Sequence, residues 1–219
     1  MQTADYRTLR EVMVDTQVRP SDVTKFPIIS AMLDTPREAF VPEGQRAVAY
    51  SETALPLPGG REMLEPRTLA KMLDALDVER EEDVLVIGAE MGYAAALLAK
   101  MAASVVAVEE DAEMAADAEA ALAAQGIDNA AVVAGPLPEG QAKAAPFDVI
   151  LVAGGVEALP AALTDQLRDG GRIAAIFMDG PLGEARLGVR AEGRMGWRFA
   201  FNATAPVLPG FAKARTFAL

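Results

Sequence analysis

The chain has 219 residues, 52% of them hydrophobic, which is enough to bury a sizeable core and enclose a ligand cleft. It contains neither cysteine nor histidine, which excludes disulfides, thiol nucleophiles, serine–histidine catalysis and the usual zinc ligands. The formal net charge of −12 disfavours nucleic-acid partners, because phosphates would be repelled. The apolar runs are shorter than the ~20 residues of a membrane span, and the N-terminus lacks a signal pattern. We therefore expect a cytoplasmic protein without a membrane partner.

Residues 1–65 are predicted to form a helical cap and a substrate-side loop. In the stretch YRTLREVMVDTQV, one helical face is predicted to carry Leu9, Val12, Met13 and Val18, and Pro20 ends the pattern. The prolines and glycines of TPREAFVPEG and ALPLPGGREMLEP are typical of a structured loop.

Residues 66–180 alternate between helical and strand patterns. The predicted strands DVLVIG, SVVAVE, NAAVVAG, FDVILVAGG and GRIAAIF are nearly unbroken apolar runs. The helical stretch PRTLAKMLDAL precedes them, and YAAALLAKM and DAEMAADAEAALAAQG lie between strands. Apolar strands separated by helices indicate a parallel sheet that is covered on both faces. The predicted fold class is α/β, with a doubly wound, mostly parallel sheet.

Residues 181–219 are predicted to add antiparallel strands to one edge of that sheet. A hairpin is expected to turn at residues 192–194, and a last strand is expected near Thr216 to Leu219. The three regions are expected to form one structural unit.

The stretch VLVIGAEMGY, residues 84–93, predicts a strand, a tight turn and the start of a helix. Doubly wound sheets bind ligands beyond the carboxyl ends of their strands, where glycines let the ligand approach the backbone and the helix N-terminus favours negative charge. Here Gly88 and Gly92 bracket the turn, and Glu90 stands in its middle. The loops expected at this edge are 88–92, 109–111, 134–137 and 153–157.

Glu109 ends the second predicted strand, about 20 residues after the glycine turn. An acidic residue at this spacing is placed to accept hydrogen bonds from both ribose hydroxyls of a nucleotide-type ligand. The alternative is that Glu109, Glu110 and Asp111 only begin a helix favourably, because negative charge stabilises a helix N-terminus. Spacing alone leaves both interpretations open.

The chain resembles the protein-L-isoaspartate O-methyltransferases over about residues 8–180. The resemblance rests on VMVDTQVRP, AMLDTPREAFVPEGQRAVAYSETALPLPGG, GAEMGYAAALLAKMAASVVAVEED and APFDVILVAGGVEALPAALTDQLRDGGRI. It implies a Rossmann-like fold of the S-adenosylmethionine-dependent methyltransferase type. It also implies that S-adenosylmethionine is the cofactor and that the activity is methylation of isoaspartyl carboxylates in damaged proteins.

The sequence departs from the family pattern at ligand-facing positions. The family's first turn is usually G-T-G-S-G-Y, and here Glu90 replaces the glycine nearest the cofactor, although Tyr93 is retained. The family's T-I-S-Q-P run places a hydroxyl beside the substrate carboxylate, and the corresponding residue here is Leu64. A G-D-G run usually supplies a carboxylate for the adenine edge, and here Pro136 stands in its place. The resemblance therefore implies Gly88, Glu90, Gly92, Tyr93, Glu109 and Pro136 as the cofactor side and Leu64 as the degenerate catalytic position.

These changes are expected to weaken methyl transfer. Methylation of a carboxylate depends mainly on positioning, because the nucleophile is already ionised. Two like charges ~4 Å apart at an effective dielectric near 20 repel by ~4 kcal/mol, so Glu90 would oppose the methionine carboxylate of the cofactor unless it swings away, pairs with a cation or faces the sulfonium. Leu64 offers no hydrogen bond to an acceptor carboxylate, and an unpaired buried group costs ~1–3 kcal/mol.

Three functional hypotheses follow. The first is a family member that is weak or inactive in isoaspartyl methylation and is retained as a binding or interaction module with a protein partner. The second is an active repair enzyme whose partner is a damaged protein or peptide. The third is a methyltransferase with a different acceptor.

Overall fold

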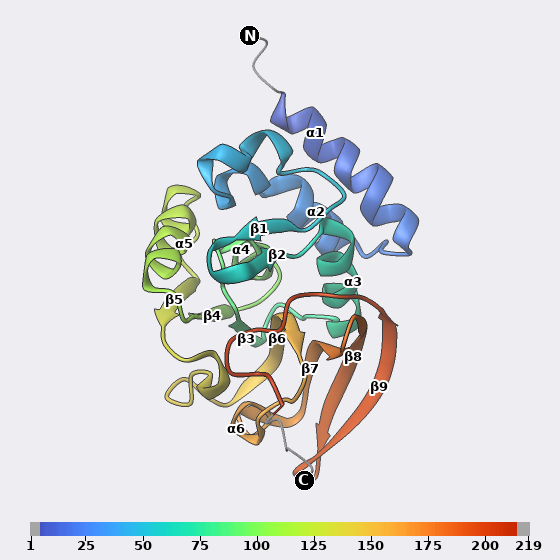
Figure 1. Cartoon of the computed structure of the whole chain (residues 1–219), viewed down its shortest axis with the longest axis vertical. Coiled ribbons are helices and arrows are strands. Elements are labelled where there is room, and N and C mark those ends of the chain that lie inside the picture. The colour runs from blue at the N-terminus through green and yellow to red at the C-terminus, as the bar shows by residue number, and fades with distance from the viewer. Residues whose placement is uncertain (1–4, 214–219) are drawn as a thin grey trace.

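The computed structural model describes residues 5–213, which are built around a twisted seven-stranded sheet (Figure 1). The strand order is β5-β4-β3-β6-β7-β8-β9. The first five strands of this order are parallel, whereas β8 and β9 are antiparallel to their neighbours. The predicted α/β class, the mostly parallel sheet and the added antiparallel strands are therefore confirmed. The last strand predicted near residues 216–219 lies outside the described residues.

The regular elements have the following bounds. The strands of the large sheet are β3 Asp83–Ile87, β4 Ser104–Glu109, β5 Ala130–Ala134, β6 Phe147–Val156, β7 Leu167–Asp179, β8 Leu182–Ala191 and β9 Arg194–Asn202. A separate hairpin consists of β1 Leu55–Leu57 and β2 Arg61–Met63. The α-helices are α1 Tyr6–Met13, α2 Phe26–Asp34, α3 Pro66–Leu76, α4 Tyr93–Ala99, α5 Ala112–Ala124 and α6 Ala161–Thr164.

Side-chain alternation along the central strands divides the core into two layers. In β3, Val84 and Val86 pack with helices α1 to α5 on one face, whereas Leu85 and Ile87 face the other side. This follows from the strand geometry, in which successive side chains point to opposite faces. Because both faces of the strand are buried, the strand reads as an unbroken apolar run.

The cover of the second face is thinner than the sequence predicts. Between β5 and β6 there is only the 3₁₀ turn η6 Leu137–Glu139, and between β6 and β7 only the four-residue helix α6. Strand β7 then turns directly into β8 at Gly180, whose φ of +57° suits a glycine, so no helix follows β7. Residues 205–211 and these short elements complete the layer.

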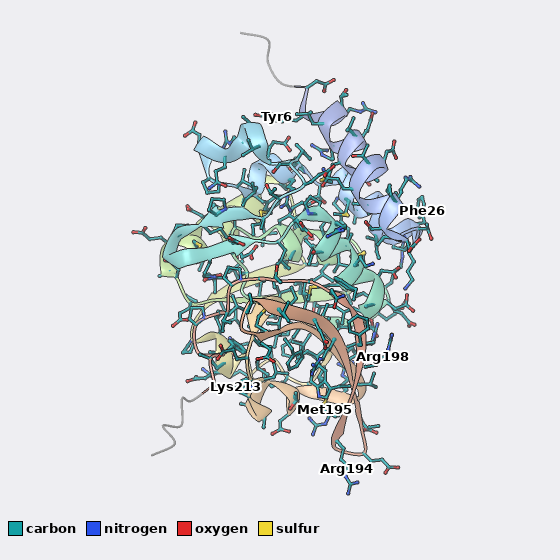
Figure 2. The ribbon with its side chains drawn as sticks, turned by 45° about the vertical axis from the view of Figure 1, so that its right-hand side comes forward. Tyr6, Phe26, Arg194, Met195, Arg198 and Lys213 are labelled. Atoms are coloured by element: carbon teal, nitrogen blue, oxygen red, sulfur yellow. The ribbon has the colours of Figure 1, made fainter. Side chains whose placement is uncertain are left out.

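The chain after β9 forms a strap that returns across the sheet. In Figure 1 it runs from β9 back towards β6 and α6. Val207 makes a parallel bridge with Gly155, and the N–H of Leu208 donates to the carbonyl of Gly155 at 2.9 Å. Phe211 is fully buried, and its carbonyl accepts from the N–H groups of residues 157 and 158. In Figure 2 Lys213, at the end of this strap, lies far from Tyr6 at the start of α1.

The N-terminal helices cover the opposite end of the molecule. Figure 1 shows α1 and α2 at the top of the molecule, beyond α3 and α4 on the same side of the sheet, and the β1–β2 hairpin below them. None of the helices among residues 5–213 is long and apolar enough to cross a membrane.

Candidate functional site

The glycine turn joins β3 to α4 at the carboxyl end of the sheet. The N–H groups of Gly88 and Ala89 both donate to the carbonyl of Val108 at 3.0 Å, which fixes the turn against β4. Gly92 is the residue that caps the N-terminus of α4; its φ is +91°, and a Cβ there would lie 3.3 Å from the Cβ of Ala118. Gly92 therefore serves both the turn and the close packing of α4 against α5.

Glu90 lies inside this turn and is buried. Its φ of +55° places it in the left-handed region, which costs a non-glycine residue roughly 1–2 kcal/mol. Its N–H donates to Oε2 of Glu109 at 2.7 Å, whereas its own Oε1 has no hydrogen-bond partner among the described residues. A strained backbone and an unsatisfied carboxylate oxygen are thus concentrated at one residue.

Glu109 is completely buried and is bound by groups of this chain. Arg61, on β2, forms an ion pair with its Oε1, and the N–H of Asp111 donates to the same oxygen at 3.1 Å. The carboxylate therefore accepts from Arg61 and from the backbone of residues 90 and 111. Helix α5 is capped instead by Asp111, whose side chain accepts from the N–H groups of residues 113 and 114.

The space over Gly88 is filled by two side chains. A Cβ added to Gly88 would lie 3.1 Å from Nη2 of Arg61 and 3.5 Å from Cδ1 of Leu208. Arg61 comes from the β1–β2 hairpin and Leu208 from the strap, so two segments far apart in the sequence meet over the turn. Both side chains are buried.

The electrostatic environment of Glu90 combines burial with two cations. Burial raises the pKa of Glu90 to about 8, Arg61 and Arg37 oppose this rise, and the Glu109 charge adds to it. Burial is the dominant effect because the carboxylate loses its hydration and no donor replaces that hydration at Oε1. Burial therefore favours the protonated form of Glu90 below about pH 8.

Arg37 and Tyr93 form a buried pair beside the turn. Arg37 is fully buried, and it donates to the carbonyls of Ala49 and Leu64, both at 2.8 Å. Its guanidinium lies 4.7 Å from the centre of the Tyr93 ring, and that ring also packs against Phe40. Tyr93 is therefore held inside the cap, and its hydroxyl has no partner within the described part of the chain.

Pro136 lies at the same edge of the sheet but on its surface. It precedes the 3₁₀ turn η6, is exposed, and follows Gly135, whose N–H donates to the carbonyl of Glu109 at 2.9 Å. Its position near β4 agrees with the expected loop, and its side chain provides no hydrogen-bonding group.

Leu64 lines a groove of about 760 Å³ between the start of α3 and the ends of β7 to β9. Neither Glu90 nor Glu109 belongs to the lining of this groove. Two of its four carboxylates form salt bridges with arginines of the groove, namely Glu65 with Arg67 and Glu184 with Arg186. The other two carboxylates belong to residues 62 and 179.

Contacts tie part of the predicted set together at the carboxyl ends of β3 and β4. Gly88, Glu90 and Glu109 are joined there by hydrogen bonds to β4 or to one another. Leu64 instead lines the groove at the start of α3, and its carbonyl accepts from Arg37 beside the turn. The sequence interpretation did not identify Arg61, Arg37 or Leu208. An arginine in a glycine-rich loop carries no pattern that distinguishes a buried side chain from a solvated one. Among residues 5–213 no group of three acidic, histidine or cysteine side chains is arranged to hold a metal ion.

Comparison with known proteins identifies the family. The family profile described as protein-L-isoaspartate(D-aspartate) O-methyltransferase matches residues 10–180. The chain belongs to this family. A protein-L-isoaspartate O-methyltransferase of Koribacter versatilis is 42% identical over 164 residues, which are 75% of this chain and 74% of that protein. Protein-L-isoaspartate O-methyltransferase 1 of Rhodopseudomonas palustris is 43% identical over 164 residues, or 75% and 67% of the two chains.

Solved structures agree with the methyltransferase fold. A solved protein-L-isoaspartate O-methyltransferase superposes with a TM-score of 0.79 at 23% identity, covering 94% of this chain and 66% of that one. A putative protein-L-isoaspartate O-methyltransferase from Plasmodium falciparum, in complex with S-adenosyl-L-homocysteine, superposes with a TM-score of 0.79 at 17% identity. That match covers 94% of this chain and 98% of the Plasmodium chain.

The conformation of this family member does not fit a nucleoside cofactor at the glycine turn. The carboxylate of Glu109, which the family resemblance assigns to the cofactor ribose, is engaged by Arg61. The surface of Gly88, where a ligand would approach the backbone, is covered by Arg61 and Leu208. Binding of such a cofactor therefore requires these two side chains to move.

Proposed function

We propose that this member of the protein-L-isoaspartate O-methyltransferase family is weak or inactive in isoaspartyl carboxylate methylation and is retained as a binding or interaction module. The observation that carries the proposal is the ion pair between Arg61 and Glu109, which engages the carboxylate expected for the ribose. A ligand competing for Glu109 must break a buried ion pair. Its apparent affinity is therefore reduced in proportion to the fraction of molecules in which the pair is broken.

Glu90 adds a second obstacle. Its carboxylate is buried within the turn, so an approaching ligand that carries its own carboxylate meets either a negative charge or the bulk of the protonated side chain. A turn of glycines would present only backbone N–H groups there. Both effects weaken the binding of S-adenosylmethionine.

The acceptor side supports the same proposal. Leu64 supplies no donor to an isoaspartyl carboxylate, and the groove beside it carries four carboxylates against two arginines that are already paired. An anionic acceptor entering this groove would be repelled and left without a hydrogen-bond donor from Leu64.

The test measures cofactor binding and turnover in the unmodified protein. We expect calorimetric titration with S-adenosylhomocysteine to give no binding tighter than the millimolar range, and an isoaspartyl peptide to receive methyl groups far more slowly than with an active family member measured in parallel. Micromolar binding together with ordinary turnover would refute the proposal.

A second candidate function is an active S-adenosylmethionine-dependent repair enzyme that methylates damaged proteins. It is favoured by relatives of this name at 42–43% identity over three quarters of the chain. A variant of this second candidate is a methyltransferase with a different acceptor, which is favoured by the net negative charge of the groove beside Leu64. Methylation of a peptide without isoaspartate by the wild-type protein would identify that variant.

A further inference from the structure

The β8–β9 hairpin forms one edge of the large sheet. We infer that this edge is a docking site for an extended segment of a partner protein in which acidic and apolar residues alternate, and that the segment pairs with β9 as an added strand. This inference names the kind of partner of the interaction module, so it rests on that part of the proposed function.

Strand β9 has one paired side and one open side. It is the last strand in the sheet order, and it pairs with β8 in a regular register over residues 194–199. Figure 1 shows β9 as the outermost strand, at the opposite end of the sheet from β5. The open side of such a strand presents unpaired N–H and C=O groups, to which an extended segment can bind.

The turn of the hairpin decides which backbone groups point outward. Glu192 and Gly193 form a two-residue turn in which both residues have a positive φ. The residues beside such a turn exchange hydrogen bonds, and every second residue along each strand then points its N–H and C=O away from the partner strand. In β9 the outward residues are Met195, Trp197 and Phe199. Within residues 5–213, no other segment donates a backbone hydrogen bond to them or accepts one from them.

One face of β9 is apolar. Because side chains alternate between the two faces of a strand, Met195, Trp197 and Phe199 share the face of the second core layer. Trp197 packs edge-on against Phe177 there, with the ring centres 5.0 Å apart. Trp197 and Phe199 are nevertheless 37% and 54% exposed, so this face can pack against apolar side chains of an added strand.

The other face of β9 is cationic. Arg194 and Arg198 are exposed, and neither forms a salt bridge within the described part of the chain. Figure 2 shows Arg194 at the end of the hairpin and Arg198 further along the same strand. Residues 182–202 contain four arginines and two glutamates, whereas the whole chain has a net charge of −12. Carboxylates of an added strand would therefore be attracted to this face.

A hollow of about 390 Å³ beside Arg198 leaves room for the side chains on the acidic face of the partner. It lies between α3 and β9, and three cationic and three acidic side chains line it. Two of the acidic side chains, Asp74 and Asp77, form salt bridges with Lys25. These two carboxylates therefore do not neutralise Arg198.

A second copy of this chain fits the edge poorly. Antiparallel pairing of two β9 strands would place the arginines of both copies on the same face of the joined sheet, where like charges repel. Two chains of net charge −12 also repel each other at long range. The edge therefore favours a strand with the opposite charge.

The experiment uses the full chain and the fluorescence of Trp197, its single tryptophan. The probe is a tryptophan-free peptide of about eight residues in which valine and glutamate alternate, which is long enough to span the regular part of β9. Binding is expected to shift the Trp197 emission to shorter wavelengths, because the added strand shields the indole from water. A peptide with the same valines and glutamates in two separate blocks is expected to give no shift, and so is an alternating valine–lysine peptide.

Two variants separate backbone pairing from charge. Met195→Pro removes an outward N–H and leaves the hydrogen bonds to β8 in place, so the probe is expected to bind about tenfold more weakly. Arg194→Glu/Arg198→Glu is expected to weaken the probe by a similar factor and to bind the valine–lysine peptide instead. This exposed charge variant also tests the inference if Met195→Pro does not fold. Arg7→Glu changes an exposed arginine that pairs with Glu11 on α1, and it is expected to bind the probe as the wild type does.

The inference is overturned if the block peptide binds as tightly as the alternating one, if reversal of both arginines leaves the affinity unchanged, or if the probe gives no shift up to about 1 mM. A concentration-dependent dimer of the free protein that Met195→Pro abolishes would also overturn it, because the edge would then bind a second copy. These outcomes are distinguishable from failure of the proposed function, which is measured with S-adenosylhomocysteine and an isoaspartyl peptide. Weak cofactor binding without binding of the probe would remove only this partner.

Discussion

Arg61 and Glu109 are 48 residues apart in the sequence and form an ion pair in which the side chains are 6% and 0% exposed. The pair connects the β1–β2 hairpin to the carboxyl end of β4, so it holds this hairpin against the central sheet. The same contact engages the carboxylate that the family resemblance assigns to the cofactor ribose. Stability and ligand binding therefore compete for one carboxylate.

We predict that breaking the pair on one side destabilises the protein strongly. Glu109→Gln leaves the buried Arg61 cation without its counter-charge, and loss of one partner of a buried pair costs about 3–5 kcal/mol. Arg61→Met/Glu109→Gln removes both charges and should recover much of this loss. Urea denaturation of the single and double variants measures the coupling, and a coupling energy near zero would show that the pair does not act as a unit.

We predict that stability falls as the pH rises from about 5 to 8. The pKa of Glu90 is about 8 in the folded protein and about 4.5 when unfolded, so the folded state binds more protons over this window. The free energy of unfolding should therefore decrease with pH, by at most about 1.4 kcal/mol per pH unit. Glu90→Gln should flatten this profile. The chain has no histidine to add a slope of its own here, and an unchanged profile in Glu90→Gln would contradict the assignment.

We predict that Glu90→Gly improves the binding of S-adenosylhomocysteine by about tenfold, equivalent to ~1.4 kcal/mol. The substitution removes a side chain and a carboxylate from the turn, and glycine adopts the φ of +55° without strain. Calorimetric titration measures the change, with the exposed turn variant Glu81→Gly as the control. Equal affinities for wild type and Glu90→Gly would show that Glu90 is not an obstacle.

Recovery of methyl transfer is expected to need more than this substitution. Leu64→Ser restores a hydroxyl on the acceptor side, and a carboxylate at residue 136 restores the group expected at the adenine edge. Because cofactor and acceptor must be held at once, the combined variant is predicted to exceed each single variant in an isoaspartyl-peptide methylation assay. Full activity from Leu64→Ser alone would show that the cofactor side is already competent.

We predict that the strap depends on a close contact between Gly154 and Leu208. A Cβ on Gly154 would lie 2.6 Å from Cδ2 of Leu208, so Gly154→Ala should cost about 1–3 kcal/mol through overpacking. Leu208→Ala should cost about 2–5 kcal/mol because it opens a cavity. The double variant should lose less free energy of unfolding than the sum of the losses in the two single variants. If the free-energy losses measured by urea denaturation are strictly additive, the two residues are not in the close contact described.

The sequence by itself determined the fold class and most of the element order. The central strands β3 and β6 are apolar runs because their residues are buried on both faces, and such runs can be recognised in the sequence alone. The hairpin turn at Glu192 and Gly193 was also predicted, because a glycine is favoured where the turn needs a positive φ. Gly193 takes a φ of +73° there. The thin second layer was not predicted, because short connections and a strap lack the periodicity of a helix.

The sequence also indicated which loops lie at the carboxyl ends of the strands, because parallel strands end at a common edge. It placed Glu90 and Glu109 together correctly, as their 2.7 Å hydrogen bond shows. Only the tertiary structure decided which side chains pack against them. Arg61 arrives from a hairpin and Leu208 from the strap, and neither the direction of a loop arginine nor the path of an irregular tail is specified by local pattern. These contacts arise from the packing of segments that are distant in the sequence. Only the folded chain therefore shows that Arg61 and Leu208 cover the glycine turn.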